Sequence, residues 1–173
     1  MTTIVVNSKC IAADRQLLIK GDDGGTHFAD GPKIKLSPCG TFAYGSTGID
    51  LSKNHTEDLE KLFRAVAHHF SGGGQLTDEG FTEMALAINK RVKKPTLILT
   101  RKLFISIIEG LIAVSDEFID YYTVGTGATF ASSAMLAGKT PKQAVEFANR
   151  YDALSGYGVD VINANKLKAI KAG

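Results

Sequence analysis

The chain of 173 residues lacks tryptophan and contains only two cysteines and four prolines. Cys10 and Cys39 both lie in apolar, strand-like contexts, so we expect reduced core residues of a cytosolic protein rather than a disulfide. No Cys/His spacing indicates a metal site, because the adjacent His68 and His69 would point in different directions on a helix. The sequence therefore predicts no metal, no cofactor and no disulfide framework.

The chain also has no large excess of positive or negative charge. The chain has 20 basic and 18 acidic residues, a net charge of +2, and no basic cluster interleaved with aromatics. Nothing therefore points to nucleic acid or to an anionic membrane. The apolar runs are too short to span a bilayer, and no signal peptide precedes the first expected strand. We expect a single cytoplasmic domain over residues 1–173, a length that allows one real core.

Hydrophobic periodicity and turn residues predict the secondary structure. Strands are expected at 3–6, 9–14, 33–36, 41–44, 96–100, 103–108, 111–114, 118–124 and 159–162, with a last edge strand at 167–170. A glycine-rich loop is expected at 21–25. Helices are expected from Thr56 to the glycines at 72–74, from Thr77 to Lys94, at 128–136, and from Pro141 towards Tyr151. Strands and helices come in blocks rather than in alternation, which favours two antiparallel sheets packed between helical layers.

Thr2 draws attention because removal of Met1 would make it the first residue. Its hydroxyl would then share a residue with a free α-amino group, whose ordinary pKa is about 8. The neutral amine can take the hydroxyl proton, which is how an N-terminal threonine becomes a nucleophile. Alone, the run from Thr3 to Val6 is more simply a buried strand that happens to follow a threonine. The case for chemistry depends on the rest of the chain.

Four segments, in this order and spacing, resemble the proteasome family of N-terminal-nucleophile hydrolases. They are Thr2-Thr3-Ile4-Val5, Ala12-Ala13-Asp14-Arg15, Val124-Gly125-Thr126-Gly127, and Asp152-Ala153-Leu154-Ser155-Gly156 with the strand that follows it. The length is similar to that of the small bacterial ATP-dependent protease subunit that forms two stacked rings. The chain departs from the family in a shorter first hairpin and in Thr126, which stands where the family usually has serine.

The resemblance implies an α+β fold, a four-layer αββα sandwich with two antiparallel sheets between helix pairs. It also implies a threonine peptidase that acts on polypeptides inside a closed homo-oligomeric ring, fed by a separate ATP-dependent unfoldase. The ATPase would be another chain, because this sequence has no Gly-x-x-x-x-Gly-Lys motif. Two alternatives stay open: an inactive assembly subunit that keeps Met1, and a hydrolase of small amides with the same nucleophile.

The resemblance further implies a role for each candidate residue. Thr2 would supply the nucleophile and the amine, Lys33 would lie beside the hydroxyl, and Asp14 would pair with the lysine. The Gly45 N–H would bind the oxyanion, where a fixed donor is worth roughly 3–4 kcal/mol. Thr126, Asp152 and Ser155 would hydrogen-bond around the amine and a nearby water.

The lysine assignment is open between two residues. Lys33 and Lys35 would point to the same face of a strand, so strand alternation does not choose between them. We prefer Lys33 because it follows the loop as the family's lysine does.

Overall fold

The structure is a computed structural model that describes residues 2–48, 57–72, 74 and 76–171. Its strands are β1 Thr3–Asn7, β2 Cys10–Asp14, β3 Gln16–Lys20, β4 Thr26–Asp30, β5 Ile34–Leu36, β6 Phe42–Ser46, β7 Thr96–Thr100, β8 Phe104–Ile108, β9 Leu111–Val114, β10 Tyr121–Gly125 and β11 Val159–Asn163. Its helices are α1 Glu57–Phe70, α2 Asp78–Arg91, α3 Ala128–Leu136 and α4 Pro141–Tyr151, followed by the 3₁₀ turn η1 Ala164–Lys166.

The strands form two main antiparallel sheets and a separate two-stranded ribbon. One sheet has the order β10-β1-β2-β11 and the other has the order β5-β6-β7-β8-β9. In the first sheet Thr3 is paired with Gly125, and Asp14 is paired with Val159. This register brings four strand ends to the same end of the sheet: the start of β1, the end of β2, the end of β10 and the start of β11. The candidate site lies there.

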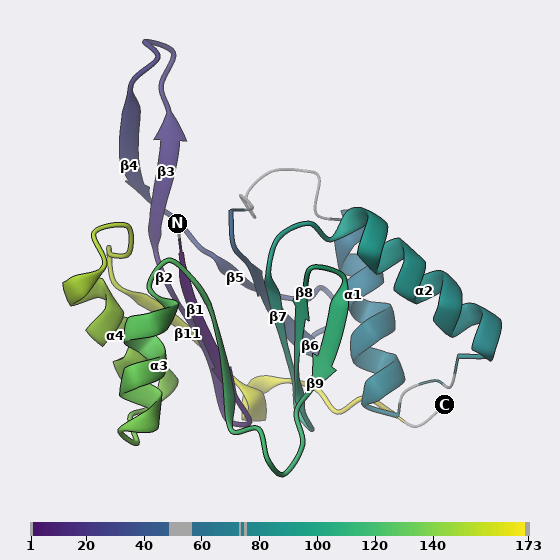
Figure 1. Cartoon of the computed structure of the whole chain (residues 1–173). Helices are drawn as coiled ribbons and strands as arrows, with labels where there is room; N and C mark the ends of the chain where they lie inside the picture. Colours follow the sequence, from purple (N-terminus) through teal and green to yellow (C-terminus); the bar gives the residue numbers. More distant parts are fainter. Residues whose placement is uncertain (1, 49–56, 73, 75, 172–173) are drawn as a thin grey trace.

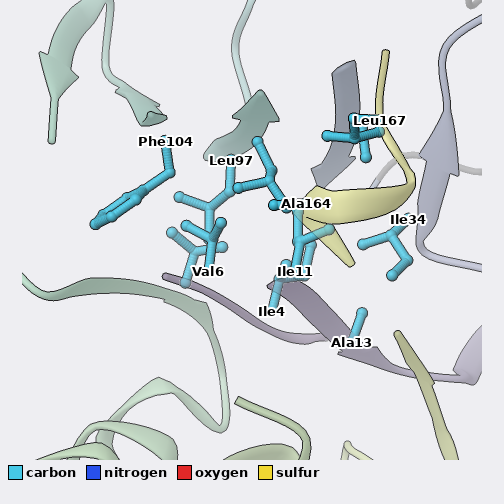
Figure 2. Close-up of a cluster of buried hydrophobic side chains, with 12 residues drawn as sticks. Ile4, Val6, Ile11, Ala13, Ile34, Leu97, Phe104, Ala164 and Leu167 are labelled. Carbon is cyan, nitrogen blue, oxygen red and sulfur yellow. The ribbon is translucent and has the colours of Figure 1, made fainter. Parts of the chain in front are cut away.

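The central core lies between the two sheets. Alternate residues of β1, Ile4 and Val6, are fully buried against Leu97 of β7 and Phe104 of β8, as Figure 2 shows. Successive side chains of a strand point to opposite faces, so Val5 of the same strand enters a different cluster. Both faces of β1 are therefore covered, which explains why its sequence is a continuous apolar run.

Helices cover the outer faces of the two sheets. Small residues of α3 and α4, such as Ala131 and Ala144, pack with Val5 and Ala12 on one side of the molecule. On the other side, α1 and α2 pack through residues such as Phe63 and Ile88 against the five-stranded sheet. Figure 1 shows the two helix pairs on opposite sides of the sheets. None of the helices in the described residues is long and apolar enough to cross a membrane.

Several expected helix ends agree with the structure. Thr77 caps α2 by accepting a hydrogen bond from Gly80 N–H. At α4, Pro141 occupies the first turn, and Thr140 and Gln143 form a reciprocal capping box. The expected start of the first helix at Thr56 lies outside the described residues.

The structure corrects three expectations about strands. Sequence analysis missed β3 and β4, which form a ribbon that projects from the body on either side of the expected loop (Figure 1). The ribbon carries half-exposed side chains such as Phe28 instead of a buried face, so its sequence lacks the apolar–polar alternation of a half-buried strand. Strand β10 begins at Tyr121, because Asp116 holds the preceding residues in a turn by accepting from Phe118 and Ile119 N–H. Residues 167–170 form no strand.

Candidate active site

The start of β1 is held against the turn that follows β10. Gly125 has φ +101°, and a Cβ added there would lie 1.7 Å from the carbonyl oxygen of Thr2. A Cβ added at Gly127 would lie 2.0 Å from Thr3 Oγ1. The Gly-Thr-Gly sequence therefore lets the backbone approach β1 more closely than any side chain would permit. Thr2 itself is 2 % exposed.

A buried ion pair lies beside this strand. Lys33 Nζ donates to both oxygens of Asp14, at 2.9 and 2.8 Å. Lys33 is 2 % exposed and Asp14 is fully buried. Burial lowers the pKa of Lys33 from its ordinary value, and the hydrogen bond from the ammonium to Asp14 opposes that change without cancelling it.

Backbone N–H groups complete the hydrogen bonding of Asp14. Thr3 N–H donates to Oδ1 at 2.8 Å, and the N–H groups of Gln16 and Gly156 donate to Oδ2, each at 3.2 Å. A buried carboxylate needs such partners to offset the loss of water. The carboxylate therefore fixes β1, the start of β3 and the loop after α4 relative to the lysine.

A second carboxylate, Asp152, ends α4 and gathers two hydroxyl groups. Thr126 Oγ1 and Ser155 Oγ each donate to Asp152 Oδ2 at 2.7 Å. Leu154 N–H donates to Oδ1 at 3.1 Å. Burial alone would raise the pKa of Asp152, but the hydrogen bonds from Ser155, Thr126 and Leu154 N–H oppose burial, and the pKa lies below its usual range.

Thr3 joins the two carboxylate clusters. Its N–H binds Asp14, and its Oγ1 lies 2.6 Å from Ser155 Oγ. Gln16 adds a second link, because its side-chain Nε2 donates to Ala153 O at 3.1 Å. Sequence analysis assigned no role to Thr3 or Gln16. Thr3 was considered only as part of an apolar run and of the family-like opening segment, and Gln16 lies in a strand that the sequence analysis missed.

The structure thus gathers most of the predicted residues in one region. Asp14 and Lys33 form one contact group, and Thr126, Asp152 and Ser155 form the other. Thr2 precedes the residue that bridges them. Their catalytic roles stay predictions, but their proximity is a property of the fold.

Lys35 and Lys33 have different environments in the structure. Lys35 is 40 % exposed at its side chain and pairs with Glu60 of α1 at 2.8 Å. The expectation that both lysines share a face was wrong, because Lys33 lies at a bend before β5 begins at Ile34. Strand alternation does not extend to a residue outside the strand.

Gly45, the expected oxyanion donor, has its backbone hydrogen bonding set by the five-stranded sheet. It stands within β6, between β5 and β7, and is paired with Leu97 of β7. Two residues further on, Thr47 N–H donates to Pro95 O at 2.9 Å. Hydrogen-bonded pairs recur at every second residue of an antiparallel ladder, so the polar groups of Gly45 also face β7. The ladder occupies the Gly45 N–H, which corrects the role expected for it.

Comparison with solved structures agrees on the fold. Eukaryotic HslV from Trypanosoma brucei matches at a TM-score of 0.64 with 18 % identity, over 93 % of this chain and 98 % of that one. The Anbu (Gly-1) mutant from Hyphomicrobium sp. strain MC1 matches at a TM-score of 0.60 with 13 % identity, over 94 % and 81 % of the two chains. Thiobacillus denitrificans BPH matches at a TM-score of 0.55 with 16 % identity, over 99 % of both chains.

No family model matches the sequence, and no curated protein matches it. The structural likeness is therefore a likeness of fold. The chain has the fold of HslV over almost its whole length, which confirms the proteasome-like fold expected from the four sequence segments.

Proposed function

We propose that this chain is a threonine peptidase of the N-terminal-nucleophile class, with Thr2 as nucleophile once Met1 has been removed. We also propose that the two sheets and two helix pairs form the four-layer αββα sandwich of that class. One observation carries the proposal: the buried pair of Lys33 and Asp14 is bonded to the backbone of Thr3, directly beside the proposed nucleophile.

The energetic cost of this pair supports a functional interpretation. A buried ion pair is often no more stabilising than apolar side chains of the same volume, because both charges lose their hydration. Stability alone therefore gives little reason to keep Lys33 and Asp14 in the core. A lysine whose pKa is lowered by burial, next to a candidate nucleophile, is the kind of group found in active sites.

The chemistry would proceed in two steps. The α-amine of Thr2 accepts the proton of Oγ1, and the oxygen attacks the carbonyl carbon of an amide. The amine then returns the proton to the leaving nitrogen, and an ester on Thr2 remains, which water hydrolyses. The Lys33 ammonium favours the developing alkoxide by its charge. Asp152, with Ser155 and Thr126, would orient the amine and the attacking water.

The oxyanion donor would be a backbone N–H at the end of β6, which lies beside the start of β5 where Lys33 stands.

The proposal extends to assembly and location. The chain would act on polypeptides within a closed homo-oligomeric ring in the cytoplasm, supplied by a separate ATP-dependent unfoldase. The fold shared with HslV supports this choice of class.

Mass spectrometry after treatment with a peptide epoxyketone tests the proposal, because that group closes a ring on both the amine and the hydroxyl of an N-terminal threonine. We expect natural protein that lacks Met1 and gains one adduct at Thr2. The Thr2→Ala variant should assemble normally and lose peptide cleavage by at least about a thousandfold, whereas Thr2→Ser should keep part of it.

Two outcomes would point elsewhere. Natural protein that retains Met1 and takes no adduct would favour the inactive assembly subunit. An adduct together with turnover of small amides, but not of fluorogenic peptides, would favour the small-amide hydrolase.

A further inference from the structure

The turn between β5 and β6 carries Cys39, whose side chain lines a cavity outside the site described above. The cavity has a volume of about 260 Å³ and lies between this turn and the first half of α1. Glu57, Glu60, Lys61 and Arg64 of α1 form much of the opposite wall. The proposed mechanism uses none of these residues.

The thiol of Cys39 is one end of a chain of polar contacts. Thr41 Oγ1 lies 3.0 Å from Cys39 Sγ and 3.1 Å from His68 Nε2. Ser37 Oγ lies 3.4 Å from the same sulfur. Burial and the charge of Arg64 lower the pKa of His68, so the ring is neutral at neutral pH. With its proton on Nε2, His68 can donate to Thr41, whose own proton can then reach the sulfur.

These contacts favour the thiolate form of Cys39. Burial alone would raise the pKa of the thiol, but hydrogen bonds from Ser37 and Thr41 and the charge of Arg64 together lower it below its ordinary value. The thiolate is the nucleophilic form of cysteine. A partly exposed thiol whose neighbours favour ionisation, beside a cavity, is therefore placed to react with a molecule that enters it.

The other cysteine provides an internal contrast. Cys10 lies in β2, where it is 8 % exposed, and burial raises the pKa of its thiol. The same chain thus holds one thiol suited to reaction and one suited to packing, and both are free cysteines.

We propose that Cys39 is a thiol–disulfide exchange site for small disulfides that carry carboxylates, such as glutathione disulfide. Lys61 and Arg64 lie one turn apart on α1 and offer two cations to such a molecule, and Lys61 also has the exposed Asp58 carboxylate at 3.9 Å. Glu60 repels it little, because its carboxylate is already bound by Lys35 at 2.8 Å and by Tyr44 at 2.5 Å. Glu57 is the remaining acidic group on the cavity wall.

The exchange needs no further oxidant. The Cys39 sulfur attacks one sulfur of the small disulfide, and a new S–S bond forms as the old one breaks. The other half leaves as a thiolate and takes a proton from water. The products are a mixed disulfide on Cys39 and one free small thiol.

Timed reaction of the purified native assembly with glutathione disulfide, followed by peptide mapping, tests the proposal. We expect Cys39 to be modified at least about tenfold faster than Cys10, since the rate follows the thiolate fraction. The Cys10→Ser variant should take one adduct at the wild-type rate, and Cys39→Ser should take none on the same timescale. In denaturant the two cysteines should react at similar rates, which controls for their intrinsic reactivity.

Arg64→Gln tests the charge preference against the neutral hydroxyethyl disulfide. We expect it to slow reaction with glutathione disulfide several-fold more than reaction with the neutral disulfide. Equal slowing of both disulfides would overturn the preference for carboxylates. Cys10 reacting as fast as Cys39 in the native protein would overturn the site itself. Thr2→Ala should leave all these rates unchanged, so the result is independent of the proposed peptidase activity.

Discussion

Lys33 and Lys35 stand two residues apart and both bind a carboxylate at 2.8 Å, yet they occupy different environments. Lys33 and Asp14 are buried at the meeting point of several backbone segments. Lys35 keeps two fifths of its side chain in solvent, although its partner, Glu60 of α1, is itself largely buried. The distance between the charges is therefore a poor guide to what each pair does.

Burial makes the difference. A pair whose cation stays in solvent is partly screened by water, whereas removing one partner of a pair that is buried on both sides costs about 3–5 kcal/mol. The buried pair also holds Thr3 and Gly156 through Asp14, so its loss would loosen the proposed site. The Lys35 pair holds only α1 to β5.

The largest effect is expected for Lys33→Met. The substitution leaves the Asp14 carboxylate buried without its cation, so unfolding free energy should fall by about 3–5 kcal/mol. Peptide cleavage should fall by at least about a hundredfold at pH 7.5, as for other lost electrostatic contacts to a reacting group. Denaturant titration and fluorogenic peptides measure the two effects.

The double variant Asp14→Asn/Lys33→Met separates stability from catalysis. It removes both charges, so it should recover part of the lost stability while cleavage stays low. Full recovery of cleavage in the double variant would show that Lys33 acts only by neutralising Asp14.

Gly127→Ala should have the next largest effect, because the added methyl group would clash with residues in the same region. The new Cβ would lie 2.0 Å from Thr3 Oγ1, so Thr3 and its contact with Ser155 must shift. We expect a loss of about 1–3 kcal/mol in unfolding free energy, the usual cost of overpacking. Gly74→Ala is the control, since a Cβ there meets nothing within 4 Å. Equal melting temperatures for the two variants would contradict the close approach.

Asp152→Asn should change how stability depends on pH. Because the folded-state pKa of Asp152 is lowered, the unfolded chain binds more protons near the ordinary value, and stability falls as pH falls through that range. The variant lacks this titration, so its unfolding free energy should depend less on pH below about pH 4.

Ser155→Ala is a milder change at the same carboxylate than Asp152→Asn. It removes one hydroxyl donor to the carboxylate, so the folded-state pKa of Asp152 should rise, and the acid loss of stability should be smaller and end at a higher pH than in wild type. Urea titrations at pH values from neutral to acid follow both variants. An unchanged acid limb in Asp152→Asn would contradict the assignment of this titration to Asp152.

Sequence reasoning succeeded where the signal is local. The bounds of α3 and of β7 and β9 agree with prediction, because a glycine turn, a proline stop or a short hairpin marks their ends. The Asp-x-x-Ser-Gly segment also pointed to a cluster that the fold assembles.

It failed where the answer depends on packing. The β3–β4 ribbon has no buried face, so its sequence carries no alternation to detect. The role expected for Gly45 failed because ladder register decides where an N–H points. Choosing between Lys33 and Lys35 required knowing that β5 begins after Lys33, and strand ends are poorly fixed by sequence.

The smallest effect is expected for Lys35→Met, and it tests the comparison most directly. Glu60 is buried but keeps the hydrogen bond from Tyr44, and the Lys35 side chain is 40 % exposed, so unfolding free energy should fall by only about 1 kcal/mol. Peptide cleavage should equal that of wild type, because Lys35 does not contact Asp14, Thr3 or the Asp152 cluster through any of its described interactions. The same two measurements used for Lys33→Met check this. A loss of cleavage comparable to that of Lys33→Met would mean that burial does not distinguish the two lysines, and the catalytic assignment would have to move to Lys35.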